Sequence, residues 1–159
     1  MKYTRLTKEQ FNELHQEFIN FLATQSITAS EWETIKTEKP EVAEQELDVF
    51  SDLIWQGVLK NAKFLENISP QQLFLFKIND KEIHLISIRI LDDTIDITTA
   101  KGYAWLQQNY ASDTVEFYTA SKPFSDDKNK DIFSLILQGA TITKGALYQF
   151  FDKIINNTK

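Results

Sequence analysis

Two apolar runs that flank Asn79-Asp80 form the clearest strand pattern in the chain, within the stretch Leu73 to Leu91. Asn79 and Asp80 can take the positive φ angles of a tight two-residue turn, so the pattern predicts an antiparallel hairpin. In that register Lys77 faces Glu82, and opposite charges support each other across the strands. The predicted hairpin collects apolar side chains on one face, where helices are expected to bury them: Phe74, Phe76, Ile78, Ile83 and Leu85. The second strand becomes more apolar as it proceeds, which predicts a central strand covered on both sides.

The first 60 residues carry apolar positions at the three- and four-residue spacing of helices. Thr7-Lys-Glu-Gln10 is a capping box, and it predicts a helix that frays near Thr24 to Ser26. Thr28 with Glu31 begins a short helix that runs to about Glu38. Pro40 opens a third helix to about Lys60, because proline suits the first helical position. This helix is expected to bury five apolar side chains: Ala43, Leu47, Phe50, Ile54 and Val58.

The rest of the chain alternates between strand and helix patterns. The expected elements are a strand over Asn61 to Ile68, a helix capped by Thr98 or Thr99 through Tyr110, a strand over Thr114 to Ala120, and helices over about Asp126 to Gln138 and Thr143 to Ile155. The fold prediction is therefore α+β. It has N-terminal helices, a central antiparallel sheet made of a meander plus one later strand, and two C-terminal helices.

Length and composition favour one domain over residues 1–159, since 42% of the residues are hydrophobic and there are only four Gly and three Pro. The absence of cysteine excludes disulfides and thiolate metal sites. No apolar run approaches ~18 residues, and the N-terminus has no apolar signal core. We therefore expect a cytoplasmic protein without a membrane partner.

The net negative charge of the chain is concentrated in one segment. Residues 31–52 hold eight acids and two lysines, which gives −6, the formal net charge of the whole chain. A line of acids on the third helix ends in a tryptophan and is the candidate partner-binding surface: Glu41, Glu44, Asp48, Asp52 and Trp55. Charge steers encounter and tryptophan anchors interfaces, so the preferred function is a non-catalytic interaction module for a basic protein or macromolecular assembly. The alternative interpretation of these acids is an ordinary solvated helix face.

Cofactor and metal chemistry find little support. His15 and His84 are the two histidines, and acids in a line on a helix cannot wrap around a cation. No cofactor is predicted, and an enzyme is the less favoured class. A small hydrolase or ligand-binding enzyme would have to use His84 as a general base, with a serine or carboxylate converging on it in space.

A second alternative comes from Gly139 to Phe151, GATITKGALYQFF. This phrase resembles the recognition-helix region of the TetR family of helix-turn-helix repressors. The resemblance implies that nucleic acid is a partner and that four residues contact phosphates or base edges: Thr143, Lys144, Tyr148 and Gln149. The phrase is no phosphate loop, because the order is Lys144-Gly145 and a helix precedes it.

Two longer phrases carry a broader resemblance: EWETIKTEKPEVAEQELDVFSDLIW, from Glu31 to Trp55, and ASKPFSDDKNKDIFSLILQGATITKGALYQFF, from Ala120 to Phe151. Together they resemble a family of small uncharacterised bacterial proteins found mainly in the Bacteroidota. The resemblance spans nearly the whole chain and implies a single-domain cytoplasmic protein. It implies no activity and no catalytic residues.

Overall fold

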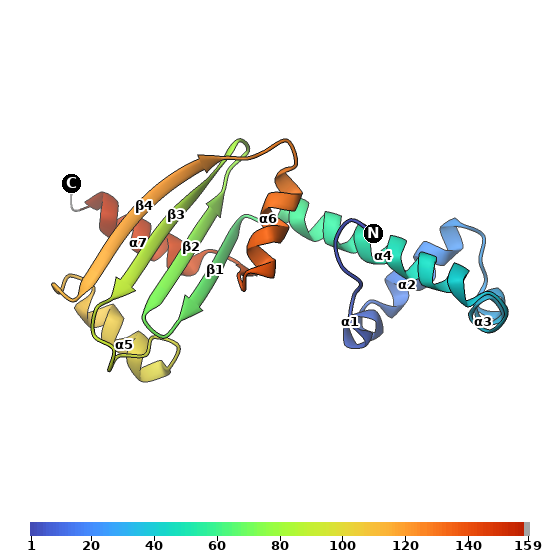
Figure 1. The fold of residues 1–159 in the computed structure, drawn as a ribbon, viewed down its shortest axis with the longest axis horizontal. Coiled ribbons are helices and arrows are strands. Elements are labelled where there is room, and N and C mark those ends of the chain that lie inside the picture. The colour runs from blue at the N-terminus through green and yellow to red at the C-terminus, as the bar shows by residue number, and fades with distance from the viewer. Residues whose placement is uncertain (158–159) are drawn as a thin grey trace. The chain divides into compact units, whose positions relative to one another are not determined.

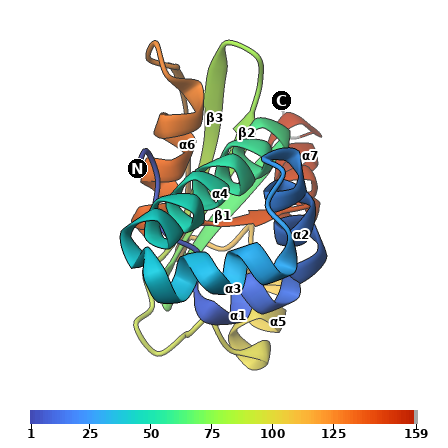
Figure 2. The ribbon, with the colours of Figure 1, turned by 90° about the vertical axis from the view of Figure 1, so that its right-hand side faces the viewer.

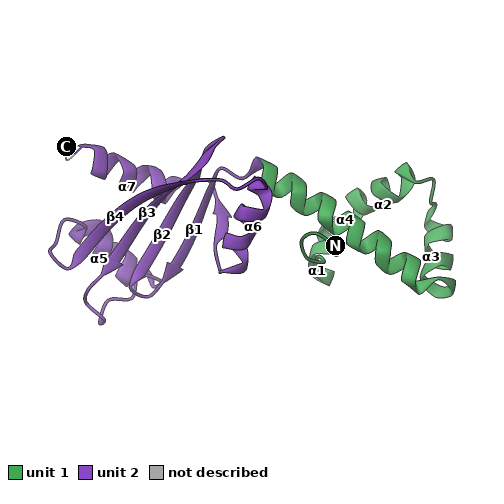
Figure 3. Cartoon of the chain, turned by 45° about the horizontal axis from the view of Figure 1, so that its top comes forward, with its two compact units in different colours: residues 1–60 green, residues 61–159 purple. Residues whose placement is uncertain are grey.

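The computed structural model of the protein describes residues 1–157, and it has the predicted α+β fold, with seven helices and five strands in the described part (Figure 1). The chain divides into two compact units, residues 1–60 and the remainder of the chain (Figure 3). The first unit is helical, and the second holds the sheet and three further helices. The expectation of one domain over the whole chain stays a prediction.

Four helices build the first unit: α1 Lys8–Glu13, α2 His15–Thr24, α3 Ala29–Glu38 and α4 Pro40–Asn61 (Figure 2). The Thr7 capping box is confirmed, and so is the Thr28 cap, whose side chain accepts from the backbone N–H of Glu31. The single helix expected after Thr7 is wrong, because Leu14 leaves helical geometry at φ −100° and ψ 23°. The break separates α1 from α2.

Aromatic side chains fill the centre of the helical unit. The ring of Phe18 lies 5.1 Å from Phe50 of α4 and 5.2 Å from Trp32 of α3, in edge-on geometry that favours aromatic pairs. On α4 the predicted burial of Val58 is wrong, since its side chain is exposed and Leu59 is buried instead. The helical period is 3.6 residues, so steps of three and four residues can depart from the buried side of a helix after several turns. The prediction therefore fails near the end of α4.

The sheet has the strand order β4-β3-β2-β1-β5, and every neighbouring pair is antiparallel. Its strands are β1 Phe64–Ser69, β2 Gln72–Ile78, β3 Glu82–Ile90, β4 Val115–Pro123 and β5 Thr141–Thr143. The meander β1-β2-β3 and the later strand β4 confirm the predicted sheet. β4 extends to Pro123, beyond the expected end at Ala120, and the short edge strand β5 was not predicted.

The register of the central hairpin differs from the sequence expectation by two residues. Ile78 pairs with Ile83, and Lys77 pairs with His84 instead of Glu82. Three residues, Asn79 to Lys81, lie between β2 and β3, and the backbone N–H of Asn79 donates to the carbonyl of Glu82 at 3.0 Å. The change of register keeps the same side chains on the same face, because the shift is even.

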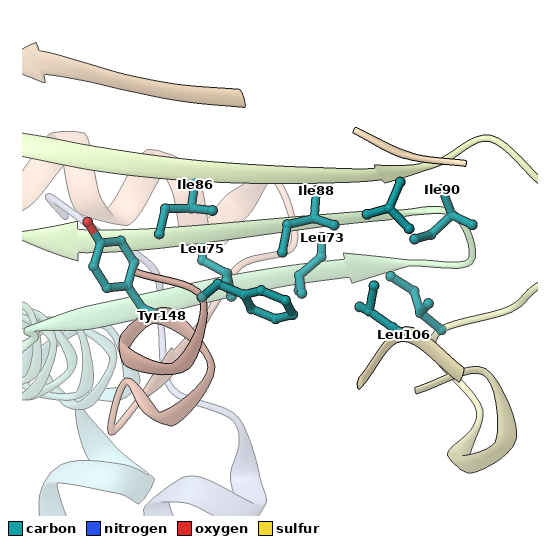
Figure 4. Close-up of a cluster of buried hydrophobic side chains, with 10 residues drawn as sticks. Leu73, Leu75, Ile86, Ile88, Ile90, Leu106 and Tyr148 are labelled. Carbon is teal, nitrogen blue, oxygen red and sulfur yellow. The ribbon is translucent and has the colours of Figure 1, made fainter. Parts of the chain in front are cut away.

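The buried face of the hairpin is the opposite of the predicted one. Helices α5, Ala100–Asn109, and α7, Ala146–Asn157, pack on aliphatic side chains from β2 and β3: Leu73, Leu75, Ile86, Ile88 and Ile90 (Figure 4). Of the set expected inside, only Ile78 is buried, and Phe74, Phe76, Ile83 and Leu85 are partly exposed. Both faces of β2 are apolar, but exposed Arg89 interrupts one face of β3. The uninterrupted face therefore forms the core. β3 is an interior strand as predicted, although the exposed Arg89 shows that its second face is not fully covered.

The C-terminal helices are separated by more than a turn. α6, Lys128–Leu137, leads through Gly139 into β5, which pairs with β1, and α7 starts at Ala146 instead of Thr143. Gly145 makes this path feasible. Its φ is +85°, and a Cβ there would lie 2.4 Å from the Phe64 ring.

Candidate functional site

The predicted acidic residues lie along one side of α4, and we call Glu41, Glu44, Asp48 and Asp52 the acidic face. Lys2, Tyr3 and Arg5 of the chain itself contact this face, at Glu44, Asp48 and Asp52. We call residues 1–6 the N-terminal segment. Glu41 is exposed in the first turn of α4, outside these contacts, and Trp55 is partly buried one turn beyond Ser51.

Arg5 occupies the space between two acids that stand one helical turn apart. Its Nε donates to Oδ1 of Asp48 at 2.8 Å, and its Nη2 lies 2.7 Å from the same oxygen. Nη1 forms an ion pair with Oε2 of Glu44, while Nη2 also donates to the Glu44 carbonyl oxygen at 3.3 Å. These hydrogen bonds, with Asp48 first and Glu44 second, raise the pKa of Arg5. The α4 face thus holds a guanidinium with two carboxylates.

Asp52 binds the backbone of the N-terminal segment. Its two carboxylate oxygens accept from the N–H groups of Lys2, at 2.7 Å, and Tyr3, at 2.9 Å. A carboxylate that accepts two consecutive amides recognises an extended backbone and needs no particular side chain.

The segment is anchored at its inner end by Ser51, which is fully buried. The N–H of Leu6 donates to Ser51 Oγ at 3.1 Å, and Ser51 Oγ donates in turn to the Leu47 carbonyl at 2.7 Å. Leu6 itself is 7% exposed and belongs to the core of the unit. Apolar burial and a buried hydrogen bond therefore fix residue 6, whereas Arg5 is held by ion pairs at the surface.

Sequence reasoning identified the three contacting acids but missed their occupant. The residues it missed are Lys2, Tyr3, Arg5 and Ser51. A usable signal existed, since Lys2 and Arg5 precede the first capping box and the acids of α4 are unbalanced by nearby bases.

His84 lies in the second unit, beside a cleft of about 350 Å³ between the β3–β4 face and α7. Its Nε2 is 3.1 Å from Oε1 of Glu82, and Ser121 is its direct partner across the sheet. Tyr148 and Asp152 of α7 line the same cleft. Burial, followed by the charge of Asp152, raises the pKa of Tyr148. A histidine, a serine and the carboxylate of Asp152 thus line one opening, and Glu82 contacts the histidine.

The four residues of the DNA-binding alternative do not lie together on one exposed helix face. Thr143 ends β5, Lys144 is exposed in the following turn, and Gln149 is exposed on α7. Tyr148 is 8% exposed and packs in the core against the sheet (Figure 4). Because β5 separates α6 from α7, these helices do not adopt a helix-turn-helix arrangement. This placement gives the DNA-binding alternative no support.

The described part of the chain, residues 1–157, contains no cluster of three or more histidine, aspartate or glutamate side chains able to hold a metal ion. None of its helices combines the length and apolarity needed to cross a bilayer.

Comparison with known proteins gives a family. The sequence profile of a family of unknown function, DUF6495, matches residues 1–156. The chain belongs to this family. The match covers nearly the whole sequence, including both compact units and the acidic face. Neither the curated proteins nor the solved structures contain a significant match to the chain.

Proposed function

We propose that this member of DUF6495 is an interaction module whose acidic face binds a basic, arginine-bearing segment of a partner protein. The observation that supports this proposal is the binding of Arg5 between Glu44 and Asp48. The partner segment takes the place of the N-terminal segment: an arginine enters the space between the two acids, and its backbone amides reach Asp52.

Displacement is feasible because the outer contacts are weak. The side chain of Arg5 is 36% exposed and that of Glu44 is 58% exposed. Ion pairs this accessible contribute about 0–1 kcal/mol each, so the contacts of Arg5 with the acids can break at low cost. Leu6 stays anchored by burial and by Ser51. The N-terminal segment therefore lowers the apparent affinity for a partner without closing the surface to it.

A labelled peptide that copies residues 1–10, MKYTRLTKEQ, is the direct probe. Fluorescence anisotropy at low salt should show binding to the full chain, and binding should weaken as salt rises. The Arg5→Ala variant of the protein should bind this peptide up to about fivefold more tightly, because its own segment no longer competes. The peptide with R5Q should bind more weakly than the parent peptide.

Charge reversal supplies the decisive control. Asp48→Lys with Asp52→Lys should abolish binding, whereas Glu13→Lys with Glu17→Lys should leave it intact. The two pairs have the same spacing and change net charge equally, but both Glu13 and Glu17 are exposed and lie on other helices. Equal binding by the two double variants would refute the proposed role of the acidic face.

The His84 cleft favours a second candidate function, a small hydrolase. Ser121 stands directly across the sheet from His84, and Glu82 lies within ion-pair distance of the imidazole. This is the set of groups that a nucleophile and its general base require. Hydrolysis of p-nitrophenyl acetate should then fall when His84→Gln or Ser121→Ala is introduced. Identical rates in the protein and both variants would remove this candidate.

A further inference from the structure

Strand β4 forms one edge of the sheet, and nothing in the described part of the chain pairs with its outer side. The strand has nine residues, and all of its side chains except Val115 are exposed. A long uncovered edge presents a row of backbone donors and acceptors, so it is a template for another strand.

Two hydrogen bonds at the ends of β4 show which residues face outward. The N–H of Leu91 donates to the Thr114 carbonyl at 2.7 Å, and the N–H of Phe124 donates to the Lys81 carbonyl at 3.1 Å. Hydrogen-bonded positions alternate along an antiparallel ladder, so the even-numbered residues of β4 face β3. The odd-numbered residues direct their N–H and C=O groups outward.

The outward donors are centred on Thr119. Those of Phe117, Thr119 and Ser121 have no acceptor in the described structure. At one end of the strand, the N–H of Val115 donates to the Ser112 carbonyl at 3.1 Å. At the other end, Pro123 has no N–H, and proline at an edge strand places its nitrogen on the outer side. The free donors therefore have a two-fold pattern about residue 119.

The charges on β4 have the same centre. Glu116 and Lys122 lie three residues before and three residues after Thr119, on the face of the sheet away from α7. We propose that β4 pairs antiparallel with β4 of a second copy of the chain, with Thr119 opposite Thr119. The two sheets then form one continuous sheet with two-fold symmetry.

This register makes the two edges complementary. Glu116 of each copy lies opposite Lys122 of the other, and Tyr118 lies opposite Ala120, so a large ring meets a small side chain. Val115 and Pro123, the two positions without a free donor, also face each other. A register shifted by two residues keeps the outward groups paired but places Glu116 opposite Ala120 or Phe124, and both charge pairs are lost.

Reversing the charge of Glu116 or Lys122, and exchanging the two residues, tests this register in the full chain. Sedimentation equilibrium should give a dimer of twice the 18.5 kDa chain. Glu116→Lys or Lys122→Glu alone should weaken dimerisation by about tenfold or more, because each change acts twice across the two-fold axis. The combined exchange of both residues should restore it. A chain that stays monomeric, or a dimer unaffected by either single reversal, would overturn the proposal.

Cross-linking tests the same pairing without altering charge. The sequence has no cysteine, so an introduced thiol is unique. Under oxidation Thr119→Cys should form a disulfide-linked dimer, since residues directly opposite have Cα atoms about 5.5 Å apart. Ser121→Cys is the matched control, because its two copies would be about 14 Å apart along the strands. Equal cross-linking of both variants would contradict the register, and circular dichroism checks that each variant is folded.

Discussion

The guanidinium of Arg5 and the carboxylate of Asp48 join two segments 43 positions apart, with Nε donating to Oδ1 at 2.8 Å. The interaction ties the beginning of the chain to the middle of α4. Glu44 and Asp48 are four residues apart on α4, so their negative charges repel each other. The guanidinium of Arg5 lies between them and offsets this repulsion. The same pairing gives the acidic face its proposed selectivity for arginine.

Removal of the Arg5 side chain should lower stability only slightly. The pair is largely accessible to solvent, so Arg5→Ala should reduce the free energy of unfolding by about 0.2–1 kcal/mol at low salt. The loss should shrink as salt screens the charges. Urea denaturation at two ionic strengths measures both effects. Lys8→Ala, a nearby exposed cation, is the control; an equal loss in that variant would contradict a specific role for Arg5.

Ser51 should matter more than Arg5. Ser51→Ala removes the acceptor for the buried N–H of Leu6, and an unsatisfied buried donor costs about 1–3 kcal/mol. Leu6 should then also lose protection from hydrogen exchange, measured by NMR together with the free energy of unfolding. Gln45→Ala, an exposed change on the same helix, should have little effect. Full protection of Leu6 in S51A would show that Ser51 does not anchor the segment.

The glycines at positions 145 and 57 should respond in opposite directions to alanine. Gly145→Ala forces a Cβ against the Phe64 ring at 2.4 Å and keeps φ at +85°, so it should destabilise the protein by about 2 kcal/mol or more. Gly57→Ala lies within α4, where an added Cβ meets no atom within 4 Å, so it should stabilise by about 0.5–1 kcal/mol. Thermal denaturation compares the pair, and equal melting temperatures would contradict the described path from β5 into α7.

Asp92 should make stability depend on pH. Hydrogen bonds from the Thr94 hydroxyl, at 2.6 Å, and from the Thr94 backbone N–H, at 2.9 Å, lower the pKa of this carboxyl. A lowered pKa in the folded state stabilises the protein above the ordinary aspartate pKa, and this contribution is lost as pH falls through the lowered value. Thr94→Val should raise the pKa of Asp92, and carbon-detected NMR titration would show it. An unchanged titration midpoint would contradict the assigned cause.

Helix ends were predictable from sequence because their determinants are local. Thr7 and Thr28 cap helices through residues three positions away, and Pro40 begins α4 as expected. The sheet was harder to predict, because both faces of β2 are apolar and the choice between them depends on α5 and α7. The hairpin register depended on how many residues connect Ile78 with Ile83, which Asn79-Asp80 alone does not determine.

The occupant of the acidic face was not predictable from local patterns. Helical spacing placed Glu44, Asp48 and Asp52 on one side of α4, but their contacts with residues 2–5 span at least 39 positions. Strand β5 was missed for a similar reason. Thr141 to Thr143 form a strand only because β1 offers an edge, and Gly145 then permits the turn into α7.

Displacement of Arg5 from the acidic face can be observed directly while a competing peptide binds. Arg5 and Arg89 are the only arginines in the sequence, so an NMR spectrum of arginine Nε–H groups contains two signals to assign. In the free protein the Nε–H of Arg5 should exchange its hydrogen slowly with water, because this group donates a hydrogen bond to Asp48. On titration with unlabelled MKYTRLTKEQ, this signal should move to the position of a solvated arginine as the peptide saturates, while Arg89 stays unchanged. Saturation by the peptide with no change in the Arg5 signal would contradict binding of a partner segment in place of the N-terminal segment.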